Sequence, residues 1–352
     1  MNVLVTGGSG FLGRYFHRAL LDAGHTITIL DLVSPEWDAE TARVIVGDVR
    51  DQGAVREALR GTQAILHLAA AHHDFGIAPD TYFSVNEQGA RVLCAAAEEQ
   101  DTRSICFFST VAVYGSTPEP RHEDSDTRPV SPYGQSKLAA ELVFRGWAEG
   151  REGRRCLVIR PTVVFGPRNF ANMYSLVRQV DSGFFFRVAG GRNVKSLSYV
   201  ENVVAAALYL WKRPVAAPFE IYNYVDKPDL ETRSLLAGIY QSLGRRMPRW
   251  SIPEPIAVGA SWPFDLVARL TGRHLTISSA RIRKMCAQTR FEADKVREAG
   301  FEPAVPLSEG IARTVSWYMR EGRNRPGDAH LPPLPLRTAR VNGGGRNGFD
   351  SE

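Results

Sequence analysis

The sequence predicts an α/β fold in which a doubly wound parallel sheet is followed by a smaller mixed α/β substrate domain, interleaved with it in the C-terminal half. Through the first half of the chain, apolar runs of strand length alternate with helical patterns. A glycine-rich turn separates the first of these strands from the first helix. After residue 160, glycine and proline interrupt the pattern and the strands become shorter. Strands that alternate with helices indicate parallel pairing through right-handed crossovers.

The first turn predicts a dinucleotide site. An apolar strand, residues 2–5, leads into the turn, and an amphipathic helix, residues 11–21, follows it. Glycine lets the backbone turn sharply and approach a pyrophosphate, whose oxygens face the free N–H groups at the start of the helix. The second strand, 26–30, ends in Asp31, which can bind a ribose 2′-hydroxyl and repel a 2′-phosphate, so the turn favours NAD over NADP. A glycine-rich turn without a ligand is the alternative. The cofactor contacts assigned to the turn are Gly7, Gly10, Phe11, Leu12 and Gly13.

The later elements extend the same pattern. Further strands are expected at 44–46, 64–68, 105–108 and 156–159, and helices near 51–60, 80–100, 131–150, 172–182, 230–243, 254–271 and 306–321. Ligands of such sheets bind beyond the carboxyl ends of the strands, which places Asp31, Asp48, Ala69 and Ser109–Thr110 on one rim. We expect an NAD-binding domain over 1–160 with 196–223 returning to it, a substrate domain over 161–195 and 224–322, and a disordered tail over 323–352.

Composition excludes several classes of function. The net charge is only +5 in 352 residues and lies partly in the tail, so no nucleic-acid surface is indicated. The four cysteines show no paired spacing and are expected to be buried thiols in a reducing compartment. No charged, apolar leader precedes the first strand, and the later apolar stretch 256–264 is too short to span a bilayer. We therefore expect a cytoplasmic protein with neither nucleic acid nor membrane as a partner.

One helix carries the residues of a proton-transfer site. Ser131-Pro132 is a favourable helix start, and Tyr133 and Lys137 then lie four residues apart on one face. The pKa of a tyrosine phenol is normally about 10, but a lysine and a positive nicotinamide ring would stabilise its phenolate. Tyr133 could then remove a hydroxyl proton while hydride leaves the same carbon. Thr110, at the end of its strand, could hold the substrate oxygen. The alternative is a surface tyrosine and lysine on an ordinary helix.

The order of the motifs resembles that of the extended short-chain dehydrogenases/reductases, and within them the NAD-dependent sugar epimerase/dehydratase branch. The resemblance covers about residues 1–320 and is most specific in the first 170. It rests on Thr6–Gly13, Asp31, Gly47-Asp48, His67-Leu-Ala-Ala70, Val85-Asn86, Ser109–Gly115, Tyr133–Lys137 and Arg160-Pro161.

The resemblance implies a Rossmann sheet, a role for each motif residue, and a homodimer formed through the helices near 80–100 and 131–150. Tyr133 would be the acid/base, Lys137 its activator and ribose anchor, and Thr110, rather than Ser109, the assisting hydroxyl. Further NAD contacts would come from Asp48 near the adenine, Ala69 near the nicotinamide half, and Val49, Leu68 and Pro161. Asn86 would support the site and is also a candidate substrate contact.

The chain departs from the family pattern at one site that concerns the reaction and at another that concerns contact with the sugar nucleotide. Related dehydratases carry an Asp-Glu pair directly after the assisting hydroxyl, where this chain has Val111 and Ala112. Elimination of water and decarboxylation are therefore disfavoured, which leaves oxidation, reduction, or reversible oxidation during epimerisation. An asparagine that contacts the sugar nucleotide in related epimerases is replaced by Val163.

Basic residues in the second half are candidates for the substrate diphosphate. Lys195 aligns with a phosphate-binding arginine of the family, but it binds phosphate as a point charge without the bidentate fork. Arg283 is a second candidate, with Arg281 competing, and a solvated basic helix face is the alternative for both. His72-His73-Asp74 is expected to be a loop over the substrate or an exposed polar loop rather than a metal site, because adjacent histidines face different directions.

The resulting functional prediction is an NAD-dependent enzyme of nucleotide-sugar metabolism that resembles the UDP-sugar 4-epimerases and forms a transient 4-keto sugar. A nucleotide-sugar 4-ketoreductase remains open, because the motifs do not distinguish it. A 3β-hydroxysteroid dehydrogenase-like enzyme acting on an apolar alcohol also remains open, because Ser198–Val203 resembles that branch. A non-catalytic NAD-binding protein is least favoured, since such relatives usually lose the tyrosine or the lysine.

Overall fold

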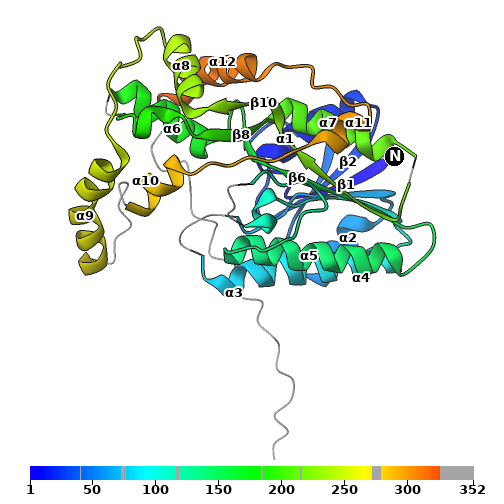
Figure 1. Cartoon of the computed structure of the whole chain (residues 1–352). Coiled ribbons are helices and arrows are strands. Elements are labelled where there is room, and N and C mark those ends of the chain that lie inside the picture. Colours follow the sequence, from blue (N-terminus) through cyan, green and yellow to red (C-terminus); the bar gives the residue numbers. More distant parts are fainter. Residues whose placement is uncertain are drawn as a thin grey trace, which may run out of the picture.

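A seven-stranded parallel sheet organises the protein (Figure 1). The computed structural model describes residues 1–39, 41–72, 77–115, 119–183, 185–214, 216–271 and 279–325, without the side chains of 264–271, 280, 281, 284 and 285. In spatial order the strands are β3 (Ala42–Val46), β2 (Thr26–Asp31), β1 (Asn2–Thr6), β4 (Ala64–His67), β5 (Ser104–Phe108), β6 (Arg155–Pro161) and β9 (Phe219–Tyr224). The predicted doubly wound sheet is thereby confirmed.

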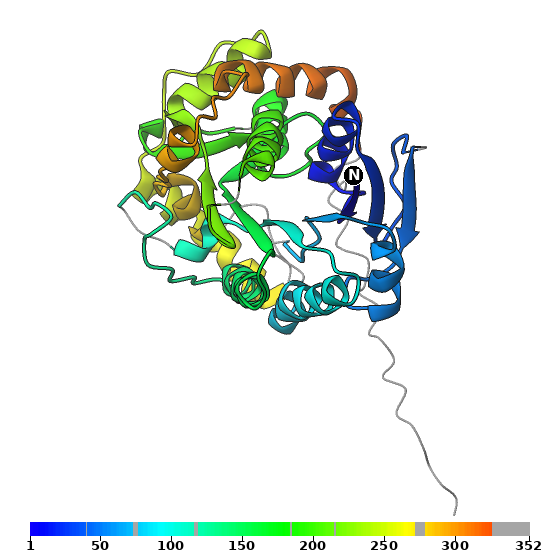
Figure 2. The ribbon, with the colours of Figure 1, turned by 90° about the vertical axis from the view of Figure 1, so that its right-hand side faces the viewer.

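Two layers of helices cover the opposite faces of this sheet (Figure 2). One layer holds α1 (Phe11–Asp22), α7 (Val200–Lys212) and α11 (Asp294–Glu298), and the other holds α2 (Gln52–Leu59), α4 (Gly89–Glu99) and α5 (Pro132–Glu149). Successive strand residues point to opposite faces, so the sheet separates two apolar cores. In β1, for example, Val3 and Val5 belong to one core and Leu4 to the other.

A smaller mixed sheet lies beside the large one. It consists of β10 (Asp226–Glu231), β8 (Val194–Tyr199) and β7 (Val163–Phe165), with β8 parallel to β7 and antiparallel to β10. The remaining helices are α3 (Pro79–Tyr82), α6 (Asn172–Ser182), α8 (Thr232–Ser242), α9 (Glu254–Thr271), α10 (Ser279–Cys286) and α12 (Leu307–Trp317). Of the stretch 196–223, residues 196–199 thus pair in the small sheet, and 219–223 pair in the large one. The domain boundaries themselves stay a prediction.

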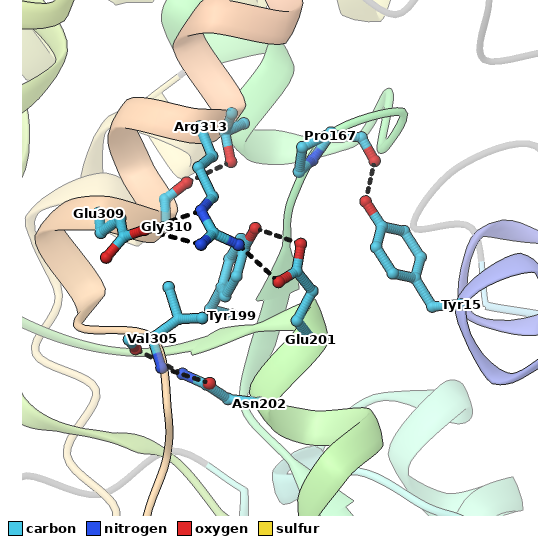
Figure 3. Close-up of polar contacts among 10 residues, drawn as sticks. Tyr15, Pro167, Tyr199, Glu201, Asn202, Val305, Glu309, Gly310 and Arg313 are labelled. Carbon is cyan, nitrogen blue, oxygen red and sulfur yellow. Dashed lines mark hydrogen bonds and ion pairs between the residues drawn. The ribbon is translucent and has the colours of Figure 1, made fainter. Parts of the chain in front are cut away.

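Polar contacts fasten the C-terminal segment to the start of α7 (Figure 3). The amide of Asn202 donates to the carbonyl of Val305 at 2.8 Å and accepts from its N–H at 3.1 Å. Arg313 on α12 forms an ion pair with Glu201 at 2.7 Å. Beside them lies a surface cavity of about 550 Å³, whose lining includes none of the predicted cofactor or catalytic residues. Two of its arginines pair with its two glutamates: Arg313 with Glu201, and Arg168 with Glu321 at 2.6 Å.

The expected elements are confirmed with small shifts. The helix expected near 80–100 is interrupted by a π-helical stretch, Phe83–Gln88, and the last helix ends at Trp317 before a second π-helical turn, Tyr318–Gly322. Asp48 does not end its strand: β3 stops at Val46, and Asp48 begins a turn in which its carbonyl accepts from the N–H of Asp51 at 2.9 Å. Three cysteines are buried as expected, but Cys286 is only half-buried.

Candidate active site

The glycine turn has the geometry of a dinucleotide cradle. Gly7 has a φ of +70°, and a Cβ on it would lie 2.6 Å from the backbone nitrogen of Ala69. Only glycine lets β1 and the loop after β4 approach so closely. No side chain caps the first turn of α1, which begins after Gly10, so its N–H groups face the cradle. Such a turn fits the pyrophosphate of NAD.

Asp31 closes one end of this cradle. Its carboxylate accepts hydrogen bonds from the backbone N–H groups of Ser9 at 3.0 Å and Val33 at 3.4 Å. Burial raises the pKa of Asp31, and these backbone hydrogen bonds oppose the rise. The carboxylate retains further acceptor capacity for a ribose hydroxyl. A hydrogen-bond acceptor at this position fits the ribose hydroxyls of NAD.

Asp48 and Val49 follow the next strand of the same rim. Asp48 accepts from Arg50 through both carboxylate oxygens, with the shortest distance 2.6 Å, and Arg50 also donates to Ser84 at 3.0 Å. Val49 is buried against Gly89 of α4. Because β2 and β3 are parallel neighbours, Asp31 and the turn holding Asp48 lie at the same edge of the sheet.

The start of α5 brings the predicted reacting residues together. Ser131 caps the helix by accepting from the N–H of Gly134 at 3.1 Å. A Cβ on Gly134 would lie 2.7 Å from the carbonyl of Ala112, so the first turn of α5 packs directly on the 3₁₀ turn Val111–Tyr114. Thr110 caps that turn and accepts from the N–H of Ala112 at 3.1 Å, which leaves its hydroxyl proton for another acceptor.

Tyr133 and Lys137 differ in their surroundings. Tyr133 is half-buried, and its ring centroid lies 6.4 Å from that of Tyr82. Lys137 is buried, with its Nζ 4.2 Å from the centre of the Phe107 ring. Burial lowers the pKa of Lys137 to about 7, although the charge of Glu141 opposes this shift. The pKa is therefore low enough for the charge on Lys137 to depend on pH near neutrality.

A buried polar network beneath α5 includes residues that sequence reasoning missed. Glu141 accepts from Arg160 through both oxygens, at 2.9 and 2.5 Å, and it also accepts from the hydroxyl of Ser109. Arg160 donates to the hydroxyl of Tyr114 at 2.7 Å, which donates to Asn223 at 2.8 Å. The engagement of Ser109 with Glu141 supports Thr110 as the assisting hydroxyl. Glu141 could have been found from its place four residues after Lys137.

Asn86 fastens the loop after β4 to α5. Its amide accepts from the N–H of Ala71 at 2.9 Å and donates to the carbonyl of Ala71 at 3.1 Å and to Ser136 at 2.9 Å. Ser136 lies next to Lys137 in the helix, and Ala71 is close to Leu68 and Ala69. These contacts favour the supporting role over substrate contact for Asn86.

His67 is a second residue without a predicted role that lies in this core. It is buried at the end of β4, with Nδ1 2.7 Å from the hydroxyl of Thr6 and its ring stacked on Phe107. Burial, and secondarily the charge of Lys137, lowers the pKa of His67 to about 3. The imidazole is therefore neutral at physiological pH.

The two candidate phosphate residues lie near each other in the smaller half. Lys195 on β8 donates through Nζ to the carbonyl of Ala287 at 2.6 Å. Ala287 in turn donates through its N–H to the carbonyl of Arg283, whose side chain is exposed on α10. Val163, at the position of the expected asparagine, is exposed. Pro161 ends β6 and pairs with Tyr224, beside the small sheet.

Some predictions fall outside the described residues. These are the side chain of Arg281, residues 73 and 74 of the His72-His73-Asp74 loop, and residues 326–352 of the tail. Within the described part of the chain, no cluster of three or more His, Cys, Asp or Glu residues is arranged to hold a metal ion. None of the described helices has the length and hydropathy needed to cross a membrane.

Comparison with known proteins agrees with this geometry. N-acetyl-alpha-D-glucosaminyl-diphospho-ditrans,octacis-undecaprenol 4-epimerase of Escherichia coli O157:H7 is 41% identical over 318 residues, which cover 90% of this chain and 95% of that protein. A 3beta-hydroxysteroid-dehydrogenase/decarboxylase of Arabidopsis thaliana is 24% identical over 365 residues, covering 92% and 81%. The UDP-glucose 4-epimerase of Thermus thermophilus, in complex with NAD, has the same fold, with a TM-score of 0.71, 23% identity, and coverage of 91% and 100%.

A sequence model of the NAD dependent epimerase/dehydratase family matches residues 3–224. That span is more than half of the chain, and it contains the glycine turn, Asp31, Thr110, Tyr133 and Lys137. The chain therefore belongs to the NAD dependent epimerase/dehydratase family and is an NAD-dependent enzyme of the extended short-chain dehydrogenase/reductase type.

Proposed function

We propose that this enzyme inverts a hydroxyl-bearing carbon, C4, of a sugar that is joined to a carrier through a diphosphate. The observation that carries the proposal is the packing of α5 on the 3₁₀ turn, which groups Tyr133 and Lys137 with Thr110 and leaves Val111 and Ala112 in place of carboxylates. Without an acid there, oxidation to a transient 4-keto sugar followed by reduction on the other face is favoured over loss of water.

Tyr133, Lys137 and Thr110 each have a separate role in the proposed reaction. Bound NAD supplies the acceptor, and then the donor, of the hydride. Tyr133 takes the proton from the sugar hydroxyl and later returns it. Lys137, when charged, stabilises the phenolate of Tyr133. Thr110 donates its hydroxyl proton to the same sugar oxygen, because its own oxygen already accepts from Ala112.

The carrier has two candidates. Nucleotide diphosphates such as UDP follow from the motif resemblance and are the carrier named for the structural neighbour from Thermus thermophilus. Diphospho-undecaprenol is favoured by the Escherichia coli relative, whose 41% identity extends over 90% of this chain. We propose that Lys195 and Arg283 contact the diphosphate in either case, since both carriers present the same anionic group.

Product analysis distinguishes these carriers and the alternative reactions. The purified enzyme is incubated with NAD and either UDP-N-acetylglucosamine, UDP-glucose or N-acetylglucosaminyl-diphospho-undecaprenol, and the released sugars are separated by chromatography. The expected product is the 4-epimer without net formation of NADH. Stoichiometric formation of NADH together with a 4-keto sugar would instead indicate a ketoreductase working in reverse. Conversion of hydroxysteroids but of no diphospho-sugar would contradict the proposal.

Replacing the acid/base tests the mechanism on whichever substrate is converted. Tyr133→Phe removes the proton-transferring oxygen, so we expect turnover to fall by about 10²- to 10⁴-fold while NAD binding persists. Tyr209→Phe removes the hydroxyl of another tyrosine, exposed on α7, and should keep the wild-type rate. A Tyr133→Phe enzyme with near-normal turnover would exclude this mechanism.

A further inference from the structure

An apolar surface lies on α9, at the end of the molecule opposite the N-terminus (Figure 1). In the first half of this helix Ala257 and Ser261 are buried. None of the exposed residues from 255 to 263 has a charged side chain, and only the indole of Trp262 can form a side-chain hydrogen bond. These exposed residues are Pro255, Ile256, Gly259, Ala260, Trp262 and Pro263, of which Ile256 is 62% and Trp262 70% exposed. A helix exposed on the surface usually turns polar side chains to water.

Two loops, one of which leads into α9, carry a pair of exposed aromatic rings. Phe186 and Trp250 are both about half-exposed, and their ring centroids lie 5.7 Å apart. The loops that carry them are paired: the N–H of Ile252 donates to the carbonyl of Arg187 at 2.8 Å, and Arg187 donates to the carbonyl of Arg249 at 2.7 Å. The aromatic pair is therefore held in place by its backbone.

Most of the charges around these aromatic side chains are positive, although Glu254 is the first residue of α9. Residues 182–200 contain three basic residues and no acidic one, and residues 232–253 contain four basic residues and no acidic one. Of these, Arg245 is partly neutralised by Asp181 at 2.8 Å. Arg246 and Arg249 are exposed immediately before Trp250.

We infer that the α9 face, defined as Phe186, Trp250, Ile256 and Trp262 with Arg246 and Arg249, docks on the surface of an anionic lipid bilayer. Tryptophan and phenylalanine favour the membrane interface, and arginines are attracted to anionic headgroups. α9 lacks the length and hydropathy needed to cross a bilayer, so it would lie on such a surface. A second copy of the chain is a poorer occupant, because a two-fold contact would bring like charges together.

This inference goes beyond the proposed function and does not depend on it. It revises the sequence-based expectation that a membrane is no partner of the chain. α10 packs on α9, and Ala287 connects α10 to the strand of Lys195. A protein docked through α9 would therefore keep both elements close to the bilayer.

Co-sedimentation with lipid vesicles tests the inference without any substrate. The full chain is mixed with vesicles of phosphatidylcholine alone or with one third phosphatidylglycerol, each at low and high salt. We expect binding to the anionic vesicles and weaker binding at high salt. Absence of the protein from the anionic vesicle pellet would overturn the inference.

Paired variants separate the apolar and the charged contributions. Ile256→Ser/Trp262→Ser should lower the partition coefficient by about tenfold or more, because two interfacial side chains are lost. Arg246→Gln/Arg249→Gln should lower it by about tenfold on anionic vesicles only. Val46→Ser, at a 60% exposed site on β3, and Arg18→Gln/Arg60→Gln serve as matched controls and should bind like wild type. Wild-type binding by both test variants would contradict the inference.

Two further measurements separate this inference from its competitors. Light scattering gives the mass of wild type and of Ile256→Ser/Trp262→Ser; a lower mass in the variant would make the α9 face a protein interface and overturn membrane docking. Turnover of a water-soluble UDP-sugar without vesicles should be equal in all variants. Vesicle binding that persists when no sugar is converted would refute the proposed function alone.

Discussion

At Lys137, burial favours the neutral amine, whereas the proposed chemistry needs the charged ammonium. Its Nζ lies over the Phe107 ring in a core where water is excluded, and burial lowers its pKa to about 7. The proposed chemistry needs the ammonium, because only the charged form stabilises the phenolate of Tyr133. Glu141, one helical turn further along α5, opposes the shift and favours the charged form.

Substitution of Lys137 should reveal the stability that its burial costs. The unfolded lysine has a pKa near 10.5, above the folded value, so below about pH 7 the wild type must bury a charge. Its stability therefore rises as pH increases from about 7 to 10.5. We expect Lys137→Met to be more stable than wild type at pH 6, with a difference that shrinks toward pH 10. Urea unfolding at a series of pH values measures this, and a constant difference would refute the lowered pKa.

Asp31 should set the choice between NAD and NADP. Its carboxylate is oriented by the N–H groups of Ser9 and Val33 and would meet a ribose 2′-phosphate with like charge. Asp31→Asn keeps the shape but removes the charge, so NAD binding should weaken about tenfold and NADP binding should strengthen. Calorimetric titration with both cofactors measures the ratio. An unchanged preference would place the 2′-hydroxyl elsewhere.

At the scale of elements, α5 is held by a buried ion pair that links it to β6. Arg160 and Glu141 are each about 3% exposed. Burial alone would lower the pKa of Arg160, but the hydrogen bonds and charge of Glu141 raise it above its usual value. Removing one partner of such a pair leaves an uncompensated charge, which costs far more than the intact pair contributes.

Glu141→Gln should therefore destabilise the protein by about 3–5 kcal/mol, and Glu141→Leu/Arg160→Met should recover much of that loss. Urea unfolding of the wild type and the two variants measures the free energies. The pH dependence of turnover distinguishes a role of Glu141 in the active site from a role in stability alone. Without Glu141 the pKa of Lys137 falls further. The alkaline limb of the pH–activity profile should therefore move to lower pH. A destabilised enzyme with an unchanged profile would limit Glu141 to a structural role.

The elements that the sequence predicted well carry local signals. Ser131-Pro132 begins α5, glycine occupies the one φ of +70° in the first turn, and apolar runs mark the central strands. The network of Ser109, Glu141, Arg160, Tyr114 and Asn223 was missed because its members come from four separate segments. Only the pairing of β5, β6 and β9 brings those segments together.

The sheet to which β8 belongs could not be predicted from local signals for the same reason. Its apolar residues fit either sheet, and the choice depends on distant partners, β7 and β10, which no local pattern specifies. Lys195 was predicted as a phosphate contact from the family resemblance alone, and its bond to Ala287, 92 residues away, depends on the tertiary fold. Local motifs therefore suggest catalytic candidates, which stay predictions, more readily than they suggest the residues that support them.

At the scale of the whole molecule, two exposed helix surfaces are candidates for contact with a partner. The α9 face is apolar with a positive surround, whereas the outer side of α4 and α5 is mixed in charge and carries one large apolar residue, Leu142. Membrane docking fits the first, and a two-fold homodimer through α4 and α5, as the family resemblance implies, fits the second. The surfaces lie on different parts of the molecule (Figure 1), so both contacts can form at once.

Leu142→Glu tests the dimer. Leu142 is 61% exposed on α5, and in a two-fold contact the same surface of each copy meets the other. Two glutamates would then enter an apolar contact together, at a cost that a modest interface cannot offset. We expect the mass from light scattering to fall from that of a dimer to that of a monomer of 38.9 kDa. Val46→Glu, at a matched exposure on β3, should leave the dimer intact. If Leu142→Glu stays dimeric while Val46→Glu dissociates, the interface runs through the edge strand, and the helices α4 and α5 are excluded.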